Sequence, residues 1–224
     1  MKVLVKWLRD TRGVSLYEIA AAVAMTGILA AVAVPVVIER TTEAKAARVV
    51  QEADALYQAI LAFQRDTGKV PGESENVRLL LSGPQGFFAV LPDGARTALA
   101  IGGVSINEST QACSAGCANL NDYLVRDPNA ILGALNGNTR YPNWRGPYVG
   151  EVFIDQFDRS YIANVAALYR REQSSPGSCG FAWVYSGGPD RTLTTKLTDT
   201  TFATDSDDLG KNNGKALGPG PGCQ

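Results

Sequence analysis

The sequence predicts an α+β fold in which one long N-terminal α-helix packs on a small antiparallel β-sheet. The first observation behind this prediction is an uncharged apolar run, Ile19 to Ile38, that leads directly into an amphipathic stretch, residues 39–67. The second is a set of short segments after residue 145 that are rich in β-branched and aromatic side chains and are bounded by turn signals. A chain of 224 residues with 45% hydrophobic content has room for one membrane helix and one compact head.

The apolar run is long enough to cross a membrane. Twenty helical residues span about 30 Å, the thickness of the hydrocarbon core. Four basic side chains and one acidic side chain precede the run, at Lys2, Lys6, Arg9, Arg12 and Asp10. Positive charge beside a membrane helix tends to remain in the cytoplasm, so everything after Ile38 is predicted to lie on the far side.

A small residue, Gly13, stands before the apolar run rather than after it. A secretory signal peptide has its cleavage site after the apolar region, whereas a cut at Gly13 would remove only the basic leader. Glu18 places a carboxylate at the start of the run, where an unpaired charge costs on the order of 3 kcal/mol. Its partner is either the new amino terminus of Val14 in a neighbouring chain or, in an ordinary signal anchor, interfacial water.

At these residues the chain resembles the type IV pilins and the type II secretion pseudopilins. The resemblance implies that a membrane-embedded prepilin peptidase cuts after Gly13 and methylates the new terminus at Val14. It assigns Glu18 to the family's acidic position and Pro35 to its helix-bending proline, both with roles in assembly. Val14 and Tyr17 replace the usual phenylalanine and isoleucine and keep these positions apolar.

The helix is expected to continue beyond the membrane to Thr67. An apolar stripe at helical spacing runs through residues 39–67, at Val49, Ala53, Leu56, Ile60 and Phe63. Gly68 and Pro71 are typical of a C-terminal stop. The whole helix would be about 80 Å long. Pro35 removes one backbone hydrogen bond and is expected to bend or loosen the helix near Ala31, unless it forms only a harmless kink.

Four segments follow from these patterns. They are a leader over residues 1–13, a transmembrane and polymerisation helix over 14–38, an amphipathic extension over 39–67, and a globular head over 68–224. In the head, strands are expected at Tyr148–Ile154, Ser160–Leu168 and Gly180–Ser186. A variable connection precedes them, with short helices at Asn119–Val125 and Pro128–Leu135.

Three motifs of the head are similar to those of the major pseudopilin of type II secretion systems. They are Asn143–Tyr148, Asp155–Tyr161 and Tyr185–Asp190. The resemblance implies that the first enters the sheet, the second forms a tight turn of an aspartate and an aromatic residue, and the third opens a calcium-binding loop.

Carboxylates for a structural calcium ion would come from four acidic residues, Asp190, Asp205, Asp207 and Asp208. The alternative is a solvated acidic loop without metal. No other cofactor is expected.

All four cysteines follow the membrane segment, at Cys113, Cys117, Cys179 and Cys223. An even number in an exported domain favours two disulfides, and three connectivities are open. We favour Cys113–Cys117 with Cys179–Cys223, because the second bridge would fasten the glycine- and proline-rich tail. A zinc site is the alternative, and the absence of histidine from the sequence argues against it.

The net charge and the sequence motifs limit the classes of function to be expected. Subtracting the leader's +3 from the formal net charge of −1 leaves −4 on the rest of the chain, so no nucleic-acid partner is indicated. The chain carries no histidine, no GxSxG and no P-loop pattern, so we expect no enzyme. A hydrolase built on a Ser/Lys pair or on paired carboxylates is the alternative from another class. A signal-anchored periplasmic binding module that never polymerises is a further one.

The resemblance implies a structural subunit of a type IV pilus-like filament. A type II secretion pseudopilin is expected, with a surface pilin for adhesion, motility or DNA uptake as the alternative. The implied location is the inner membrane, with a single span and a periplasmic head, followed by a periplasmic or extracellular filament. The implied partners are further copies of the chain, other pilin-like subunits, the prepilin peptidase and the inner-membrane assembly platform.

Overall fold

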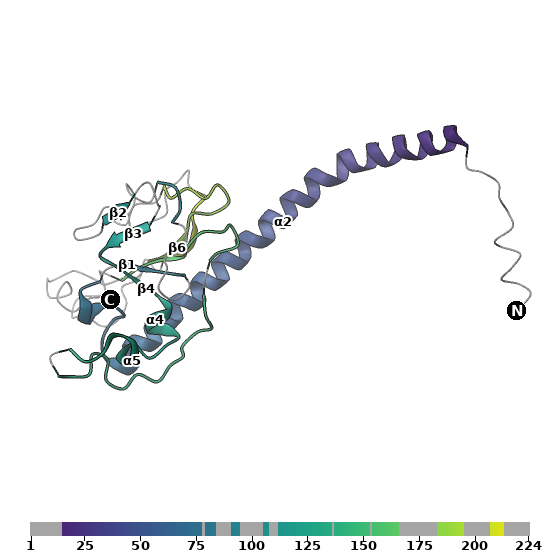
Figure 1. Ribbon diagram of the computed structural model, residues 1–224. Helices are drawn as coiled ribbons and strands as arrows, with labels where there is room; N and C mark the ends of the chain where they lie inside the picture. The colour runs from purple at the N-terminus through teal and green to yellow at the C-terminus, as the bar shows by residue number, and fades with distance from the viewer. Residues whose placement is uncertain are drawn as a thin grey trace, which may run out of the picture. The chain divides into compact units, whose positions relative to one another are not determined.

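The longest element of the protein is helix α2, Leu16–Thr67 (Figure 1). The computed structural model describes residues 15–77, 79–83, 91–94, 105–107, 112–135, 137–152, 154–165, 183–194 and 207–212. The chain divides into two units, residues 1–43 and 44–224, which we describe separately. The first contains the apolar part of α2, and the second contains the rest of α2 and the head.

In the first unit, α2 is helical without interruption, including at Pro35. Of the two effects expected of Pro35, loosening near Ala31 is therefore not seen, whereas Figure 1 shows a bend in the N-terminal half of α2. The hydroxyl of Thr26 donates to the carbonyl of Ala22 at 2.9 Å, one turn earlier. This polar side chain is satisfied by its own helix, so it leaves no unpaired group on the apolar surface.

In the second unit, α2 presents the predicted stripe to the core. Its buried side chains are Val49, Ala53, Leu56, Tyr57, Ala59, Ile60, Phe63 and Thr67, which include every residue of the predicted stripe. The helix ends at Thr67 as expected, where Gly68 adopts a φ of 70° that favours glycine. The Thr67 hydroxyl donates to the Phe63 carbonyl at 2.8 Å and satisfies one of the last acceptors.

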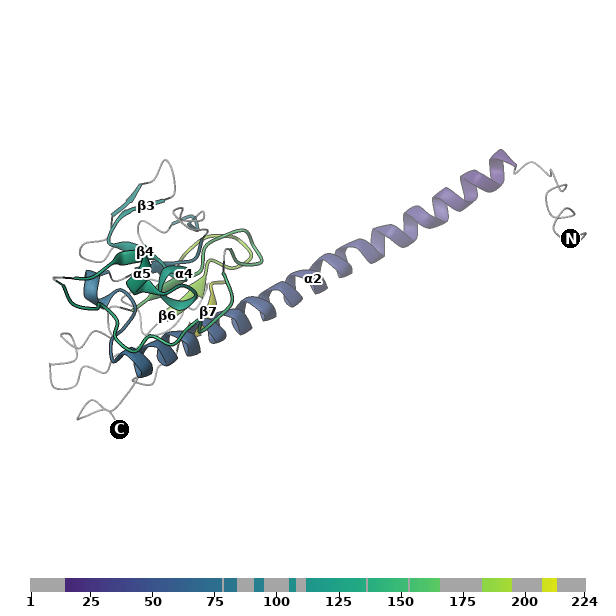
Figure 2. The ribbon, with the colours of Figure 1, turned by 60° about the horizontal axis from the view of Figure 1, so that its bottom comes forward.

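The stripe packs on a five-stranded sheet with the order β4-β1-β5-β6-β7. The strands are β1 (Leu79–Leu81), β4 (Cys117–Asn119), β5 (Ile162–Asn164), β6 (Trp183–Ser186) and β7 (Leu209–Asn212). β1 pairs with β4 in parallel, and the other pairs are antiparallel. The sheet is therefore mixed rather than wholly antiparallel. Figure 2 shows β6 and β7 beside α2.

The connection between α2 and the later strands contributes two strands to this sheet. All three leucines of β1 are fully buried, and β1 lies between β4 and β5. A separate two-stranded sheet pairs β2 (Ser105–Asn107) with β3 (Ala112–Ala115). Cys113 and Cys117 form the predicted disulfide, with 6.2 Å between their Cα atoms. Cys179 and Cys223 lie outside the described residues.

Both short helices predicted before the sheet are present, as α4 (Asn121–Leu124) and α5 (Pro128–Leu132). The Asp127 carboxylate accepts the Asn129 N–H at 2.9 Å and caps α5. Pro128 takes the first helical position, where its missing N–H leaves nothing unsatisfied. A 3₁₀ turn, η1 (Glu73–Glu75), follows α2.

One predicted strand is wrong. Among the described residues of Tyr148–Ile154 none belongs to a strand, so the first head motif does not enter the sheet. The side chain of Asn121 takes both backbone groups of Val152: Val152 N–H donates to Asn121 Oδ1 at 3.1 Å, and Asn121 Nδ2 donates to Val152 O at 2.6 Å. An amide side chain thus replaces a neighbouring strand. The two remaining predicted strands are confirmed by β5 and β6 within the described residues, and residues 166–182 lie outside the described set.

A long apolar N-terminal helix on a small mixed sheet is broadly pilin-like. The long helix packed on a sheet confirms the predicted α+β class.

Truncating a buried side chain of β1 tests the core. We expect Leu80→Ala to lower the free energy of unfolding by roughly 2–5 kcal/mol, because Leu80 is fully buried between α2 and the neighbouring strands. Val50→Ala is the control: Val50 is 39% exposed on α2, so a change within about 0.5 kcal/mol is expected. Chemical unfolding of the detergent-solubilised chain measures both, and equal losses would contradict the core described above.

Candidate functional site

The first part of α2 is an uncovered apolar surface. The large hydrophobic side chains from Leu16 to Ile38 are between 53% and 86% exposed. Among the described residues, α2 is the one helix that is long and apolar enough to cross a membrane, with a mean hydropathy of 2.4 over its most apolar window. A surface of this size needs another apolar environment, either lipid or further protein.

Glu18 lies in the first turn of this helix and is exposed. Its backbone N–H donates to the Ser15 carbonyl at 2.9 Å. A carboxylate here faces the positive end of the helix dipole, which favours it by roughly 0.3–1 kcal/mol. Gly13 and Val14, the predicted cleavage and methylation positions, lie outside the described residues. The structure thus places Glu18 and Pro35 on one continuous helix and leaves the processing site untested.

Two of the three head motifs meet in the structure. The buried carboxylate of Asp155 accepts the backbone N–H groups of Phe157 and Arg159, both at 2.8 Å, and so closes the predicted aspartate–aromatic turn. Its second oxygen accepts the hydroxyl of Ser186, at the end of β6. The Ser186 hydroxyl oxygen in turn accepts the Gly188 N–H at 3.1 Å. Sequence reasoning missed this link, because nothing in the spacing of the two motifs shows that they touch.

The loop after β6 passes very close to the segment before β7. Gly188 has a φ of 64°, and a Cβ at this position would lie 2.0 Å from the carbonyl oxygen of Asp207. Only glycine fits there. The Asp190 N–H donates to the Asp207 carboxylate at 2.9 Å, and the Thr194 N–H donates to the Asp208 carboxylate at 3.1 Å. The loop after β6 is therefore tied to both aspartates before β7, and Asp190 lies beside Asp207.

The surroundings of Asp190 shift the pKa of its carboxyl. Burial raises the pKa of the Asp190 carboxyl above its ordinary value, the hydrogen bond from the Thr192 N–H lowers it, and the nearby Asp207 carboxylate raises it again. Yet within the described residues no three acidic, cysteine or histidine side chains converge closely enough to hold a metal ion. These side chains do not by themselves fit a calcium ion. Asp205 lies outside the described set, so the four-ligand calcium site stays a prediction.

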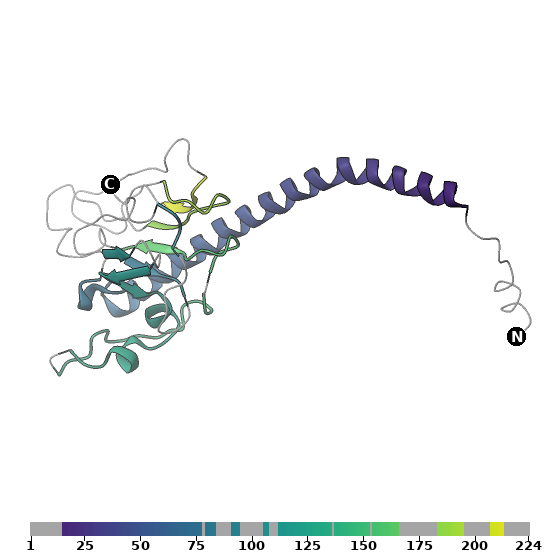
Figure 3. The same cartoon turned by 45° about the horizontal axis from the view of Figure 1, so that its top comes forward.

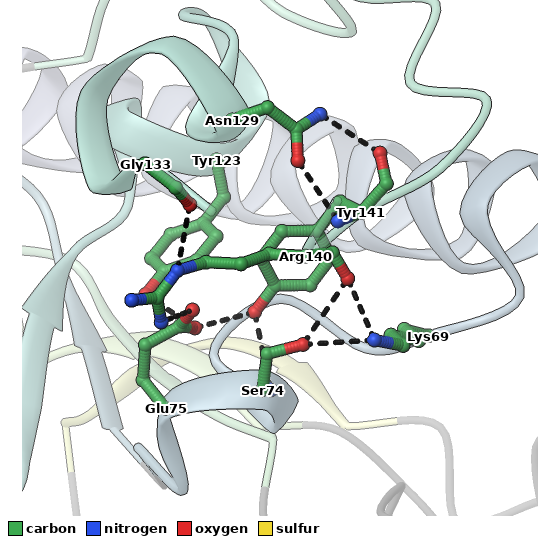
Figure 4. A network of polar contacts seen from close by, with 8 residues as sticks. All are labelled: Lys69, Ser74, Glu75, Tyr123, Asn129, Gly133, Arg140 and Tyr141. Carbon is green, nitrogen blue, oxygen red and sulfur yellow. Dashed lines mark hydrogen bonds and ion pairs between the residues drawn. The ribbon is translucent and has the colours of Figure 1, made fainter. Parts of the chain in front are cut away.

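A second polar cluster joins the turn after α2 to the segment after α5 (Figure 4). The Glu75 carboxylate accepts Arg140 at 2.8 Å, the Tyr141 hydroxyl at 2.5 Å and the Tyr123 hydroxyl at 3.2 Å. Lys69 Nζ donates to the Arg140 carbonyl at 2.6 Å. Burial and the Glu75 hydrogen bond raise the pKa of Tyr141 above its ordinary value. The cluster is a structural clamp, because its polar groups form hydrogen bonds and an ion pair with one another.

No protein-family model, curated protein or solved structure matches this chain.

Removing the Asp207 charge tests the electrostatics of the acidic loop. Asp207→Asn keeps an oxygen acceptor for the Asp190 N–H and deletes the repulsion, so the pKa of Asp190 should fall toward its ordinary value of 3.8. Because burial is the larger cause, the fall is expected to be partial. Carboxyl NMR titration of the full chain in detergent measures it. Asp122→Asn, in the ion pair with Arg126, is the control and should leave the pKa of Asp190 unchanged.

The raised pKa of Asp190 determines how the stability of the folded loop depends on pH. A raised carboxyl pKa means that the folded loop favours the protonated form. The stability contributed by Asp190 is therefore full below its unfolded pKa and is lost as the pH rises through the folded value. Asp207→Asn should reduce that loss, and a larger loss in the variant would contradict this description of the loop.

Proposed function

We propose that this chain is a structural subunit of a type IV pilus-like filament, most closely a type II secretion pseudopilin. The observation that carries the proposal is the exposed apolar surface of α2 from Leu16 to Ile38, which belongs to the same helix as the core stripe of the head. In the membrane, lipid would cover this surface. In the filament, the same surface would pack against the α2 helices of neighbouring copies.

Three features of the sequence fit assembly better than simple anchoring. The segment is rich in alanine and contains Gly27, and small residues let helices approach closely. The Glu18 carboxylate has a natural partner in the methylated amine that cleavage before Val14 would create. Pairing between these two groups would select the register of one helix against the next.

The choice of a secretion pseudopilin rests on the head motifs. The turn closed by Asp155 and its hydrogen bond to Ser186 give the second and third motifs a shared structural role. A surface pilin for adhesion, motility or DNA uptake is the second candidate, favoured by the Cys113–Cys117 disulfide, a bond more frequent in surface pilins. In both cases the proposed location is the inner membrane with a periplasmic head, and the proposed partners are the prepilin peptidase, the assembly platform and other pilin-like subunits.

The proposed function predicts processing at Gly13. We expect the chain isolated from its native membrane to begin at Val14 and to be heavier than the unmodified sequence by one methyl group. Intact mass combined with sequencing of the N-terminal peptide measures both. A chain that retains Met1 to Gly13 would contradict the proposal and favour a signal-anchored binding module.

The proposed function also predicts that filament assembly depends on Glu18. Glu18→Ala leaves the partner amine unpaired in an apolar environment, at a cost on the order of 3 kcal/mol. Filament yield should therefore fall by on the order of a hundredfold. Electron microscopy and a sedimentation assay measure this yield.

The control for this substitution is Glu43→Ala, which removes an exposed ion pair with Arg40 on the same helix. Its effect should be small, because such pairs contribute about 0–1 kcal/mol. The mass of Glu18→Ala must show normal processing, so that a loss of filaments reflects assembly. Normal filament yield from processed Glu18→Ala would contradict the proposed pairing of Glu18 with the amino terminus.

A further inference from the structure

A groove of about 390 Å³ opens in the head between α2 and the 149–156 segment. Its apolar lining comes from Leu56, Val149, Val152 and Ile154. Ile154 is 43% exposed, more than any other large hydrophobic side chain in the described part of the head. The groove is therefore an apolar surface without a cover.

The acidic residues at this groove already have internal partners. Glu52 accepts Arg48 Nε at 2.8 Å and the Tyr161 hydroxyl at 2.5 Å. Glu151 accepts Arg126 at 2.5 Å. A charged occupant would have to compete with these pairs, whereas an uncharged apolar occupant would not. The electrostatics of the groove thus favour a neutral, apolar ligand.

The same head carries an uncharged projection with exposed apolar side chains, residues 130–135 and 137–139, which we call the knob. It contains no charged side chain. Ile131 is 38% exposed and Leu135 is 39% exposed. The backbones of Leu135 and Asn138 exchange hydrogen bonds of 2.9 and 3.0 Å. In Figures 1 and 3 the segment after α5 extends away from the sheet.

The base of the knob is held firmly. The side chain of Asn129 accepts the Tyr141 N–H at 2.9 Å and donates to the Tyr141 carbonyl at 2.8 Å. Arg140 Nε donates to the Gly133 carbonyl at 2.9 Å while its guanidinium also binds Glu75 (Figure 4). A projection fixed in this way loses little conformational entropy on docking. The clamp around Glu75 therefore also fixes the position of the knob.

The knob and the groove are different surfaces of one head. The base of the knob packs on the end of α2, where the rings of Tyr141 and Phe63 are 5.2 Å apart, whereas the groove lies beside Arg48 to Leu56. We propose that the groove of one copy receives the knob of a second copy, through Ile131 and Leu135. Such a head-to-tail contact uses two unlike patches, and when the rotation does not close it produces an open helical filament. This inference rests on the proposed function and names the contact between heads.

Thiol cross-linking in the full-length chain tests the contact. The chain with Leu135→Cys and Ile154→Cys, assembled from its membrane, is treated with a short bismaleimide. Docking brings the two new thiols together at high effective concentration, so on the order of tenfold more cross-linked product is expected than from a control pair. The control combines Leu135→Cys with Pro189→Cys, an exposed position in the loop after β6. The parent chain sets the background from its own cysteines.

The pattern of products decides between the occupants. A ladder beyond the dimer in the Leu135/Ile154 cysteine pair, with neither single substitution forming oligomers, supports the proposal. Dimers from Leu135→Cys alone would mean that knob meets knob, and a product joining Ile154→Cys to a different protein would mean another occupant; both overturn it. Normal filaments without cross-links overturn the contact alone, whereas absence of both filaments and cross-links contradicts the proposed function as well.

Discussion

The apolar surface of α2 from Leu16 to Ile38 is the constraint on which the rest of this structure depends. Each large hydrophobic side chain there forgoes roughly 1.5–3 kcal/mol as long as water surrounds it. The chain folds without covering these side chains. Lipid and a bundle of like helices can both supply the missing environment. The proposed assembly from the membrane would exchange one apolar environment for another, so packing and the pairing of Glu18 would decide the balance rather than the hydrophobic effect alone.

The same helix carries the core of the head. Val49, Leu56, Ile60 and Phe63 pack on the sheet, and the turn after Thr67 is tied by Glu75 to the segment after α5. Two further links, from Asp155 to Ser186 and from Asp190 to Asp207, hold the segment before β5 and the loop after β6. The head is thus a small core with polar clamps at its loops. This arrangement leaves the knob and the groove as defined surfaces, which we propose as the contacts between copies.

The sequence predicts the parts of this molecule that depend on local periodicity. The stripe on α2, its end at Thr67 and both short helices follow from spacing, capping and proline, and the structure confirms them. The local disulfide is one choice among three connectivities, and the structure confirms it too.

Strand pairing depends on residues that are distant in the sequence, so it is harder to predict. Three leucines in β1 show no alternation, because this strand is buried on both faces and pairs with β4 in parallel. The composition of Tyr148–Ile154 suggested a strand, but the Asn121 side chain satisfies Val152 in place of a neighbour. The link between Asp155 and Ser186 is invisible in the spacing for the same reason.

The most direct test of the central claim is a map of the assembled protein by electron cryomicroscopy, prepared from its native membrane. The account predicts a filament whose core consists of residues 16–38 from neighbouring copies, packed helix against helix with Glu18 beside the amino terminus of another copy. Single copies whose apolar helices are surrounded only by lipid or detergent, under conditions in which the processed chain is abundant, would contradict it.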